Sequence, residues 1–269
     1  MVRHPGSESA GVVSGVAAGA LAAAAVWHVG PAATWLPPVR RVFCPALDGR
    51  GRADHVALTF DDGPDPASTP YFMRLLAKHE VRATFFLVGA SLQRYPALGR
   101  ALVVGGHEVA VHGWQHDRPW FPAPLRDVRE VARAADSVRR ICGTVPQWYR
   151  PPYGILTGGR LAAARRAGLQ PVLWSTWGRD WTVNADARSV KASVLRDLTG
   201  GGTVLLHDAG GWSAPGAWRA TLGALPGLLA ECRRLGLRVG PLGEHGIGHV
   251  DALPSGRCHP LFRGRLYNG

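Results

Sequence analysis

The chain has 269 residues, of which 46% are hydrophobic and 19% charged, so it can form one large domain or two small ones around a buried core. This composition excludes wholesale disorder and a protein with several membrane spans. The formal charge is +12, and every basic residue except Lys78 and Lys191 is an arginine. The charge favours an anionic partner, but no nucleic-acid-binding motif accompanies it, so we expect no nucleic-acid partner.

The N-terminal region has the composition of a targeting segment. Residues 9–27 contain no charge and are rich in Ala, Val and Gly, with Arg3 before them. This pattern is typical of a signal peptide or a single membrane anchor, and it predicts an extracellular or membrane-anchored protein. The alternative is a disordered leader on a cytoplasmic protein. Residues 30–54, rich in Pro, Gly and Arg, are typical of a linker, so we predict a leader and linker over residues 1–53.

The four cysteines lie far apart, which disfavours a zinc ribbon or a thioredoxin-like site. They are Cys44, Cys142, Cys232 and Cys258. The sequence leaves two alternatives open, namely two disulfides in any of three connectivities, or buried thiols.

Beyond the linker, short apolar runs alternate with segments of helical spacing. Thr69–Pro70 predicts a helix start with a capping hydroxyl, and apolar residues recur on one face over Leu125–Ile141. Seven strands alternating with helices predict a parallel sheet, either open and doubly wound or closed into a barrel. The predicted strands are Val56–Thr59, Thr84–Val88, Glu108–His112, Gln147–Arg150, Pro171–Ser175, Thr203–His207 and Leu237–Val239.

Polar residues follow several of these strands, where either architecture gathers functional groups. The motifs are T-F-D-D-G-P at 59–64, H-G-W-Q-H at 112–116, R-P-P-Y-G at 150–154, D-W at 180–181 and L-L-H-D at 205–208. His112, His116 and Asp62 suit Zn²⁺ or a similar divalent ion, and they leave coordination positions open for water and substrate. This donor set is typical of a catalytic metal site.

The remaining polar side chains fit the hydrolysis of an acyl bond. Asp61 could take a proton from water activated by the ion, and His207 could protonate the leaving group. Arg150 could hold Asp61 ionised and oriented, and Asp180 could fix the tautomer of His207. A second histidine pair, His245 and His249, has the same spacing but no partner carboxylate, so we predict that both lie in a loop.

The motifs, in this order, resemble the polysaccharide deacetylase family with the NodB homology domain, carbohydrate esterase family 4. The resemblance covers residues 54–242 and includes A-T-F-F at 83–86 and G-H-E-V at 106–109. It implies an α/β fold, a distorted (β/α) barrel with seven or eight mostly parallel strands. It also implies one divalent metal ion, Zn²⁺ or Co²⁺, and removal of N-acetyl or O-acetyl groups from a polysaccharide such as peptidoglycan or chitin oligosaccharides. We therefore predict a NodB-like domain over residues 54–243 and a tail over 244–269.

The resemblance also implies a role for each motif residue. By position, the resemblance makes Asp61 the general base and His207 the general acid, with Arg150 supporting Asp61 and Asp180 supporting His207. The implied metal ligands are Asp62, His112 and His116. The implied oxyanion donor is the N–H of Tyr153, and the residues that line the acetyl pocket are Trp181 and Leu205. Two positions depart from the family pattern. Gly113 replaces a usual Ser or Thr, which predicts a looser metal loop, and Trp177 replaces a usual acidic residue, which affects substrate fit.

Two other functions fit parts of this pattern. A non-catalytic glycan-binding module of the same fold would be expected to lack Asp61, His207 or a metal ligand, and none is missing. An acetylxylan-type esterase remains the second alternative. Four tryptophans near the motif loops could stack on sugar rings or pack in the core, namely Trp114, Trp120, Trp177 and Trp212. We expect a monomer that acts on a polysaccharide, and we interpret the positive charge as attraction to an anionic envelope.

Overall fold

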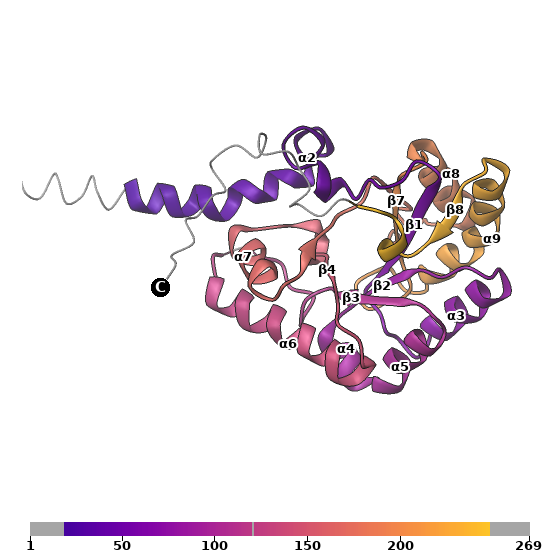
Figure 1. Ribbon diagram of the computed structural model, residues 1–269, viewed down its shortest axis with the longest axis horizontal. Coiled ribbons are helices and arrows are strands. Elements are labelled where there is room, and N and C mark those ends of the chain that lie inside the picture. The colour runs from indigo at the N-terminus through magenta and orange to yellow at the C-terminus, as the bar shows by residue number, and fades with distance from the viewer. Residues whose placement is uncertain (1–18, 120, 248–269) are drawn as a thin grey trace, which may run out of the picture.

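The computed structural model describes residues 19–119 and 121–247, and Figure 1 shows how their elements are arranged. Trp120, His249, Cys258 and most of the predicted tail lie outside the described residues. In the described part, one sheet has the strand order β5-β4-β3-β2-β1-β7-β6, and β8 pairs with β1. The strands are β1 (His55–Asp61), β2 (Thr84–Leu87), β3 (Glu108–Val111), β4 (Trp148–Tyr149), β5 (Gln170–Pro171), β6 (Thr176–Trp177), β7 (Thr203–His207) and β8 (Arg238–Gly240).

All strand pairings are parallel, and the sheet curls into a half-barrel, which agrees with the predicted distorted barrel. The doubly wound alternative is wrong, because the consecutive strands β5 and β6 lie at opposite edges and the strand order then returns to β1 through β7. The predicted fifth strand, Pro171–Ser175, is largely wrong, because only Pro171 lies in a strand, β5, and residues 172–175 are irregular and lead to β6. The reason is that the carbonyl oxygens of Val172 and Leu173 accept hydrogen bonds from the Arg150 side chain, and that of Trp174 accepts one from Arg40. Within the described residues, no strand pairing joins β5 to β6.

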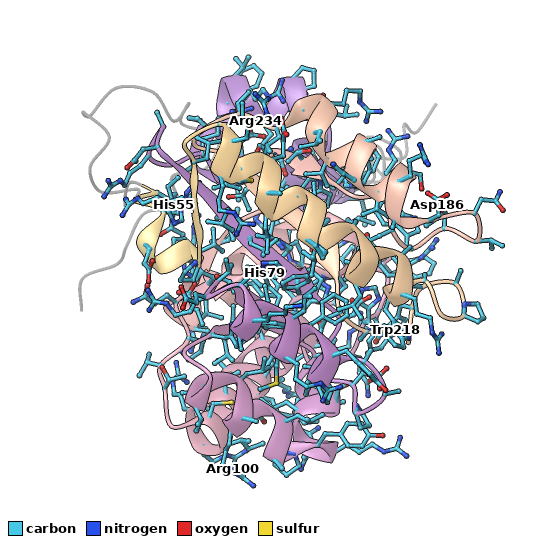
Figure 2. All side chains as sticks on the ribbon, turned by 90° about the vertical axis from the view of Figure 1, so that its right-hand side faces the viewer. His55, His79, Arg100, Asp186, Trp218 and Arg234 are labelled. Atoms are coloured by element: carbon cyan, nitrogen blue, oxygen red, sulfur yellow. The ribbon has the colours of Figure 1, made fainter. Side chains whose placement is uncertain are left out.

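Helices cover the outside of the barrel. They are α3 (Thr69–Lys78), α4 (Gly89–Arg94), α5 (Pro96–Val104), α6 (Pro124–Cys142), α7 (Gly158–Arg166), α8 (Ala187–Asp197) and α9 (Trp218–Arg234), with short turns η3 (Pro152–Gly154) and η4 (Leu242–Glu244). The helix predicted over Leu125–Ile141 is confirmed as α6. Figure 2 shows α9 running from Trp218 to Arg234 across one face, where it packs against α8 and α3.

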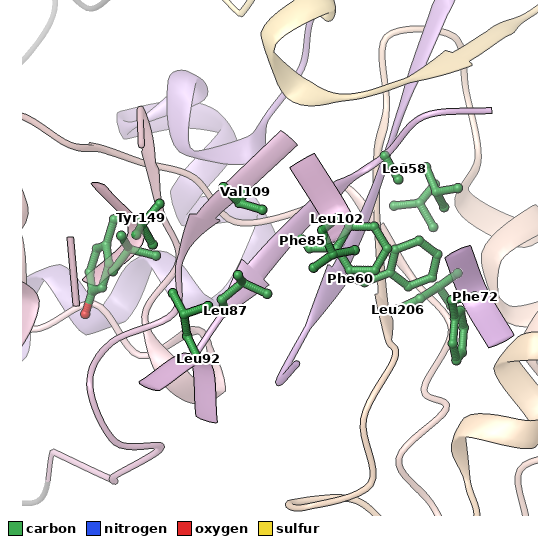
Figure 3. Close-up of a cluster of buried hydrophobic side chains, with 14 of the residues drawn as sticks. Leu58, Phe60, Phe72, Phe85, Leu87, Leu92, Leu102, Val109, Tyr149 and Leu206 are labelled. Carbon is green, nitrogen blue, oxygen red and sulfur yellow. The ribbon is translucent and has the colours of Figure 1, made fainter. Parts of the chain in front are cut away.

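The core lies between the sheet and these helices. All seven residues of β1 are buried, as expected for a parallel strand that is covered on both faces. The Phe60 ring stacks on Phe85 at 5.0 Å between centroids and meets Phe72 edge-on at 5.3 Å (Figure 3). This packing fixes the end of β1, so the residues that follow it have a defined position.

Residues 30–54 differ from the linker that the composition predicted. They form η1 (Gly30–Trp35), α2 (Pro37–Phe43) and η2 (Pro45–Asp48), each of which has a proline in its first turn. The segment packs against α7 and leads into β1 (Figure 1). The backbone N–H of Leu173 donates to the carbonyl of Leu47 at 2.8 Å, so the segment covers the gap between β5 and β6.

The helical residues 19–29 precede this segment. Among the residues that the structure describes, no helix has the length and apolar character needed to cross a bilayer. Residues 1–18 lie outside that range, so the leader stays a prediction.

Cys142 and Cys232 are buried free thiols. This excludes the alternative with two disulfides. Burial raises the pKa of each thiol to about 11, which disfavours the reactive thiolate at neutral pH.

A buried histidine pair joins η4 to β1. His245 lies in the turn after η4, and its Nδ1 is 2.8 Å from Nδ1 of His55. The Nε2–H of His245 donates to the carbonyl oxygens of Gly49 and Gly201, both at 3.1 Å. Because carbonyls only accept, Nδ1 of His245 is the acceptor of the pair and His55 is the donor. Burial and the neighbouring His55 lower the pKa of His245 to about 4.

We expect this pair to make the fold sensitive to acid. In the unfolded chain, a histidine titrates near pH 6.5, so the unfolded state binds the proton first and stability falls as the pH drops from about 6.5 towards 4. Between pH 7.5 and 5, His245 should account for a loss on the order of 2 kcal/mol in unfolding free energy. Urea unfolding at both pH values should show a smaller loss for His245→Asn than for wild type. The partly exposed His79 provides the control His79→Asn, and equal losses in all three proteins would contradict the assignment.

Candidate active site

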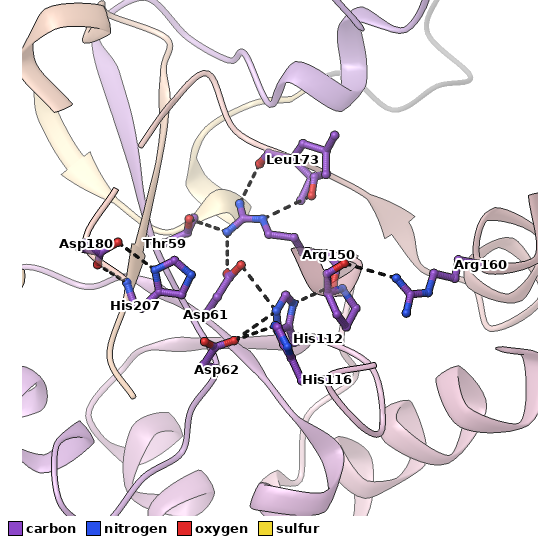
Figure 4. Close-up of polar contacts among 12 residues, drawn as sticks. Thr59, Asp61, Asp62, His112, His116, Arg150, Arg160, Leu173, Asp180 and His207 are labelled. Atoms are coloured by element: carbon purple, nitrogen blue, oxygen red, sulfur yellow. Dashed lines mark hydrogen bonds and ion pairs between the residues drawn. The ribbon is translucent and has the colours of Figure 1, made fainter. Parts of the chain in front are cut away.

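The side chains predicted to act in catalysis, metal binding and substrate binding lie together at the carboxyl ends of the strands, around a cavity of about 580 Å³. Of the ten residues predicted from the sequence, Arg150 and Asp180 are buried behind the cavity. The other eight line it, namely Asp61, Asp62, His112, His116, Tyr153, Trp181, Leu205 and His207. Figure 4 shows the His207 ring on one side of the two aspartates and the other two imidazoles on the opposite side.

Asp61, the last residue of β1, is held by a buried arginine. Its Oδ1 accepts a hydrogen bond from Nη1 of Arg150 at 2.8 Å, and the same nitrogen donates to Oγ1 of Thr59 at 2.8 Å. Arg150 is fully buried and also donates to the carbonyl of Leu173 at 2.8 Å. Oδ2 of Asp61 lies 3.8 Å from Nε2 of His112, so this oxygen faces the histidines. The arrangement leaves one carboxylate oxygen available for chemistry.

Asp62, His112 and His116 form a cluster that could hold a metal ion. Their ligand atoms lie within 4.8 Å of one another, and Oδ1 of Asp62 is 3.4 Å from Nε2 of His112 and 3.2 Å from Nε2 of His116. The Nδ1–H of His112 donates to the carbonyl of Arg150 at 2.8 Å, which leaves the Nε2 lone pair facing the cluster. Buried Oδ1 of Asp62 has no hydrogen-bond partner among the described residues.

The protonation states of Asp62 and His116 also suit a cation. Burial acts to raise the pKa of Asp62, but the neighbouring histidines outweigh it and hold that pKa below its ordinary value. Burial and the nearby His112 lower the pKa of His116 to about 3, so its ring is neutral. An ionised carboxylate and neutral imidazoles are the forms that bind divalent metals. Asp62 has a φ of 81°, a left-handed conformation that Asp adopts more readily than most residues.

His207, the last residue of β7, forms a second buried pair with Asp180. Its Nδ1–H donates to Oδ1 of Asp180 at 2.8 Å, and its backbone N–H donates to Oδ2 at 2.8 Å. Thr221 of α9 donates its hydroxyl to the same Oδ2 at 2.6 Å. Burial opposes the charge of the ring, but Asp180 outweighs it and raises the pKa of His207 to about 10. The ring is therefore protonated at neutral pH and can donate from Nε2.

Arg160 connects two loops of the site, a role that was not predicted from the sequence. Arg160 of α7 is buried and donates to the carbonyl oxygens of Pro152 at 3.3 Å, Ile155 at 3.1 Å and Asp117 at 2.5 Å. These bonds join the turn of Tyr153, whose φ is 60°, to the loop that follows His116. No spacing in the sequence indicated this role, because it depends on contacts between distant segments.

The Gly113 loop is held by backbone hydrogen bonds. The start of α4 donates from Gly89 to the carbonyl of Gly113 at 2.9 Å and from Ala90 to that of Trp114 at 3.0 Å. Gly113 has a φ of 89°, where glycine avoids the strain of a Cβ. These bonds hold the loop in place without the Ser or Thr hydroxyl that is usual at position 113 in the family.

Asp208 was also missed, although it directly follows His207. It is fully buried, and the hydroxyl of Thr69 hydrogen-bonds to its Oδ2. Its carboxylate is so close to Gly63 that a Cβ there would lie 2.7 Å from Oδ2. Burial and the nearby Asp62 raise the pKa of Asp208 to about 7, although the hydrogen bond from Thr69 acts to lower it. The predicted helix start at Thr69 is confirmed, but the predicted capping role of its hydroxyl is wrong, since that hydroxyl bonds to Asp208 instead.

Of the tryptophans named from the sequence, one packs in the core and two line the cavity, where stacking on a sugar stays a prediction. Trp114 is buried in the core, with the guanidinium of Arg133 3.5 Å from its ring centre. Trp177 and Trp212 line the cavity, and Trp212 stacks on the His116 ring at 4.6 Å.

Comparison with known proteins agrees with these observations. The profile of the polysaccharide deacetylase family matches residues 48–172. The chitooligosaccharide deacetylase of Bradyrhizobium sp. (strain ANU 289) is 39% identical over 199 residues, which cover 70% of this chain and 88% of that protein. The peptidoglycan-N-acetylglucosamine deacetylase of Bacillus cereus is 34% identical over 188 residues, which cover 68% and 84%.

A solved structure has the same architecture. The family 4 carbohydrate esterase from Streptomyces lividans, in complex with acetate, superposes with a TM-score of 0.62 at 31% identity, over 70% of this chain and 92% of that one. The motifs, the barrel and these similarities together show that the chain belongs to the polysaccharide deacetylase family of hydrolases, carbohydrate esterase family 4.

Proposed function

We propose that the chain removes N-acetyl groups from a glycan containing N-acetylglucosamine, either chitin oligosaccharides or peptidoglycan. The observation that carries this proposal is the convergence of two buried charge pairs, Asp61–Arg150 and Asp180–His207, on the Asp62–His112–His116 cluster in one cavity. The named activities of the Bradyrhizobium and Bacillus cereus relatives support the choice of glycan.

We propose Zn²⁺ as the cofactor, with Co²⁺ as a substitute, held by Asp62, His112 and His116. Nitrogen and oxygen donors of this kind suit zinc, and the unpartnered buried Oδ1 of Asp62 is a ready ligand. When bound, such an ion polarises a carbonyl oxygen and lowers the pKa of water.

The protein side chains would move two protons in the reaction. Oδ2 of Asp61 accepts a proton from the attacking water, while Arg150 holds the carboxylate in place through Oδ1. The water oxygen bonds to the acetyl carbon, and the carbon–nitrogen bond breaks. Nε2–H of His207 gives its proton to the departing nitrogen, so the products are acetate and a free amine. Asp180 keeps His207 protonated and oriented until that transfer.

Three further residues would bind the acetyl group. The backbone N–H of Tyr153 is the proposed donor to the carbonyl oxygen, where negative charge develops. Trp181 and Leu205 would enclose the methyl group, since both line the cavity and the Trp181 ring lies 5.6 Å from that of His207.

We also propose that the chain acts at the cell envelope, as a monomer. The uncharged residues 9–27 after Arg3 support export or anchoring, and the formal charge of +12 supports attraction to an anionic wall.

The function is tested by measuring acetate release from chitin oligosaccharides, peptidoglycan and acetylxylan in parallel. We expect zinc-loaded protein to release acetate from one or both of the N-acetylated glycans, and at least about tenfold more slowly from acetylxylan, since a pocket matched to one leaving group discriminates against another. Release from acetylxylan alone would indicate an O-acetyl esterase. Binding of a glycan without release from any of the three would indicate a non-catalytic module.

A further inference from the structure

The N-terminal segment, residues 30–50, forms part of the wall of the catalytic cavity. Ala32 and Trp35 line the cavity together with Asp61 and His207, although they precede β1 and all of the family motifs. The Trp35 side chain is 44% exposed. A large apolar ring that is left open beside a catalytic cavity is a candidate surface for binding substrate.

Trp35 begins a row of aromatic rings that ends at the proposed general acid. Its ring meets Trp177 edge-on, with 6.3 Å between centroids and an interplanar angle of 74°. Trp177 lies 5.0 Å from Trp181, and Trp181 meets the His207 ring at 5.6 Å. Two tryptophans therefore separate Trp35 from His207. Trp35 is positioned for a sugar beside the reacting one, and not for the acetyl group itself.

The buried Arg40 fixes the backbone that carries Trp35. Its guanidinium, 2% exposed, donates to the carbonyl oxygens of Thr34 at 2.8 Å, Trp35 at 3.3 Å and Trp174 at 2.7 Å. It also forms an ion pair with Asp48 at 2.8 Å. These bonds join the segment to the chain between β5 and β6. A ring that is already fixed in place loses less conformational entropy when a ligand stacks on it.

The contacts of Trp35 indicate the chemistry of the ligand. Trp177 and Gly154 are its neighbours, and a Cβ on Gly154 would lie 3.4 Å from Cδ1 of Trp35. The guanidinium of Arg179 lies 5.2 Å from the centre of the Trp177 ring, whereas among the described residues no cation lies over the Trp35 ring. The half-exposed indole of Trp35 therefore matches the apolar C–H face of a pyranose better than a phosphate or a carboxylate.

We infer that Trp35 and Trp177 form a binding site for a neutral pyranose ring of the glycan, next to the sugar that loses its acetyl group. This inference rests on the proposed function and assigns the N-terminal segment a part in substrate selection. It makes the enzyme favour oligosaccharides over a single sugar, because a monosaccharide cannot occupy both this site and the reacting centre.

The test compares the KM values of full-length wild type and Trp35→Ala for N-acetylated chitopentaose and for the monosaccharide N-acetylglucosamine. We expect the substitution to raise KM for chitopentaose about tenfold more than KM for N-acetylglucosamine, which corresponds to 1.4 kcal/mol, with kcat changing less than KM. Trp35→Phe, which keeps a flat ring, should retain most of the preference for the longer substrate. Trp27→Ala is the matched control, because Trp27 is also about half exposed in the N-terminal region but packs on Gly158, away from the cavity lining.

Trp35→Leu separates substrate stacking from folding, since it keeps an apolar side chain and loses the flat ring. If Trp35→Ala unfolds at a lower temperature than wild type, the comparison is made with Trp35→Leu instead. A Trp35→Leu variant that unfolds at the same temperature as wild type should still show the larger KM increase for chitopentaose. Equal KM changes for both substrates in a folded variant would overturn the inference while leaving the proposed function intact. An inactive wild type on every glycan would instead overturn the proposed function.

Discussion

Asp61→Asn should reduce the rate of acetate release by about a thousandfold, within the range that general acid–base catalysis contributes. The amide has nearly the shape of the carboxylate and can still accept the hydrogen bond from Arg150 through its oxygen. It cannot take a proton from water. Because Asp61 lies beside the Asp62–His112–His116 cluster and is not part of it, the variant should still bind about one metal ion per chain.

The measurement combines acetate release from the best substrate with metal content by elemental analysis. Asp136→Asn is the matched control, since Asp136 pairs with Arg139 on the exposed face of α6 and should leave both values unchanged. If Asp61→Asn releases acetate as fast as wild type while its metal content is normal, Asp61 is not the base. If the metal content also falls to near zero, Asp61 is a ligand and its assigned role is wrong.

Removing the metal, or one of its ligands, should have an effect of similar or greater size. Chelation of wild type should abolish acetate release, and added Zn²⁺ or Co²⁺ should restore it. His116→Ala removes one of three donors, so we expect its metal affinity to fall by at least about 100-fold and its activity to stay undetectable at metal concentrations that saturate wild type.

His79→Ala is the control for this substitution, because His79 lies at the end of α3, outside the cavity lining. It should match wild type in metal content, in activity and in recovery after chelation. Full activity of the chelated wild type, with no metal detected, would contradict a metal-dependent reaction. Wild-type metal affinity in His116→Ala would show that the ion is held elsewhere.

Much of the site could be predicted from the sequence, because its residues end strands. Asp61 and His207 are the last residues of β1 and β7, which pair in register, so a local pattern was enough to place both at one edge of the sheet. His112 and His116 follow β3 at a short spacing. The helix α6 was predicted nearly to its ends, since its buried face repeats at helical spacing over many residues.

The sequence by itself therefore determined the parallel α/β sheet and the set of groups around the cluster, and the resemblance of its motifs implied the barrel. The tertiary structure alone decided how β5 and β6 separate, how residues 30–50 cover that gap, and that Asp208, Arg160 and Trp35 belong to the site. Arg40 shows the physical reason. Its guanidinium bonds to the carbonyl of Trp174, 134 positions along the chain, and such side chain to backbone contacts leave no periodic signal near either residue.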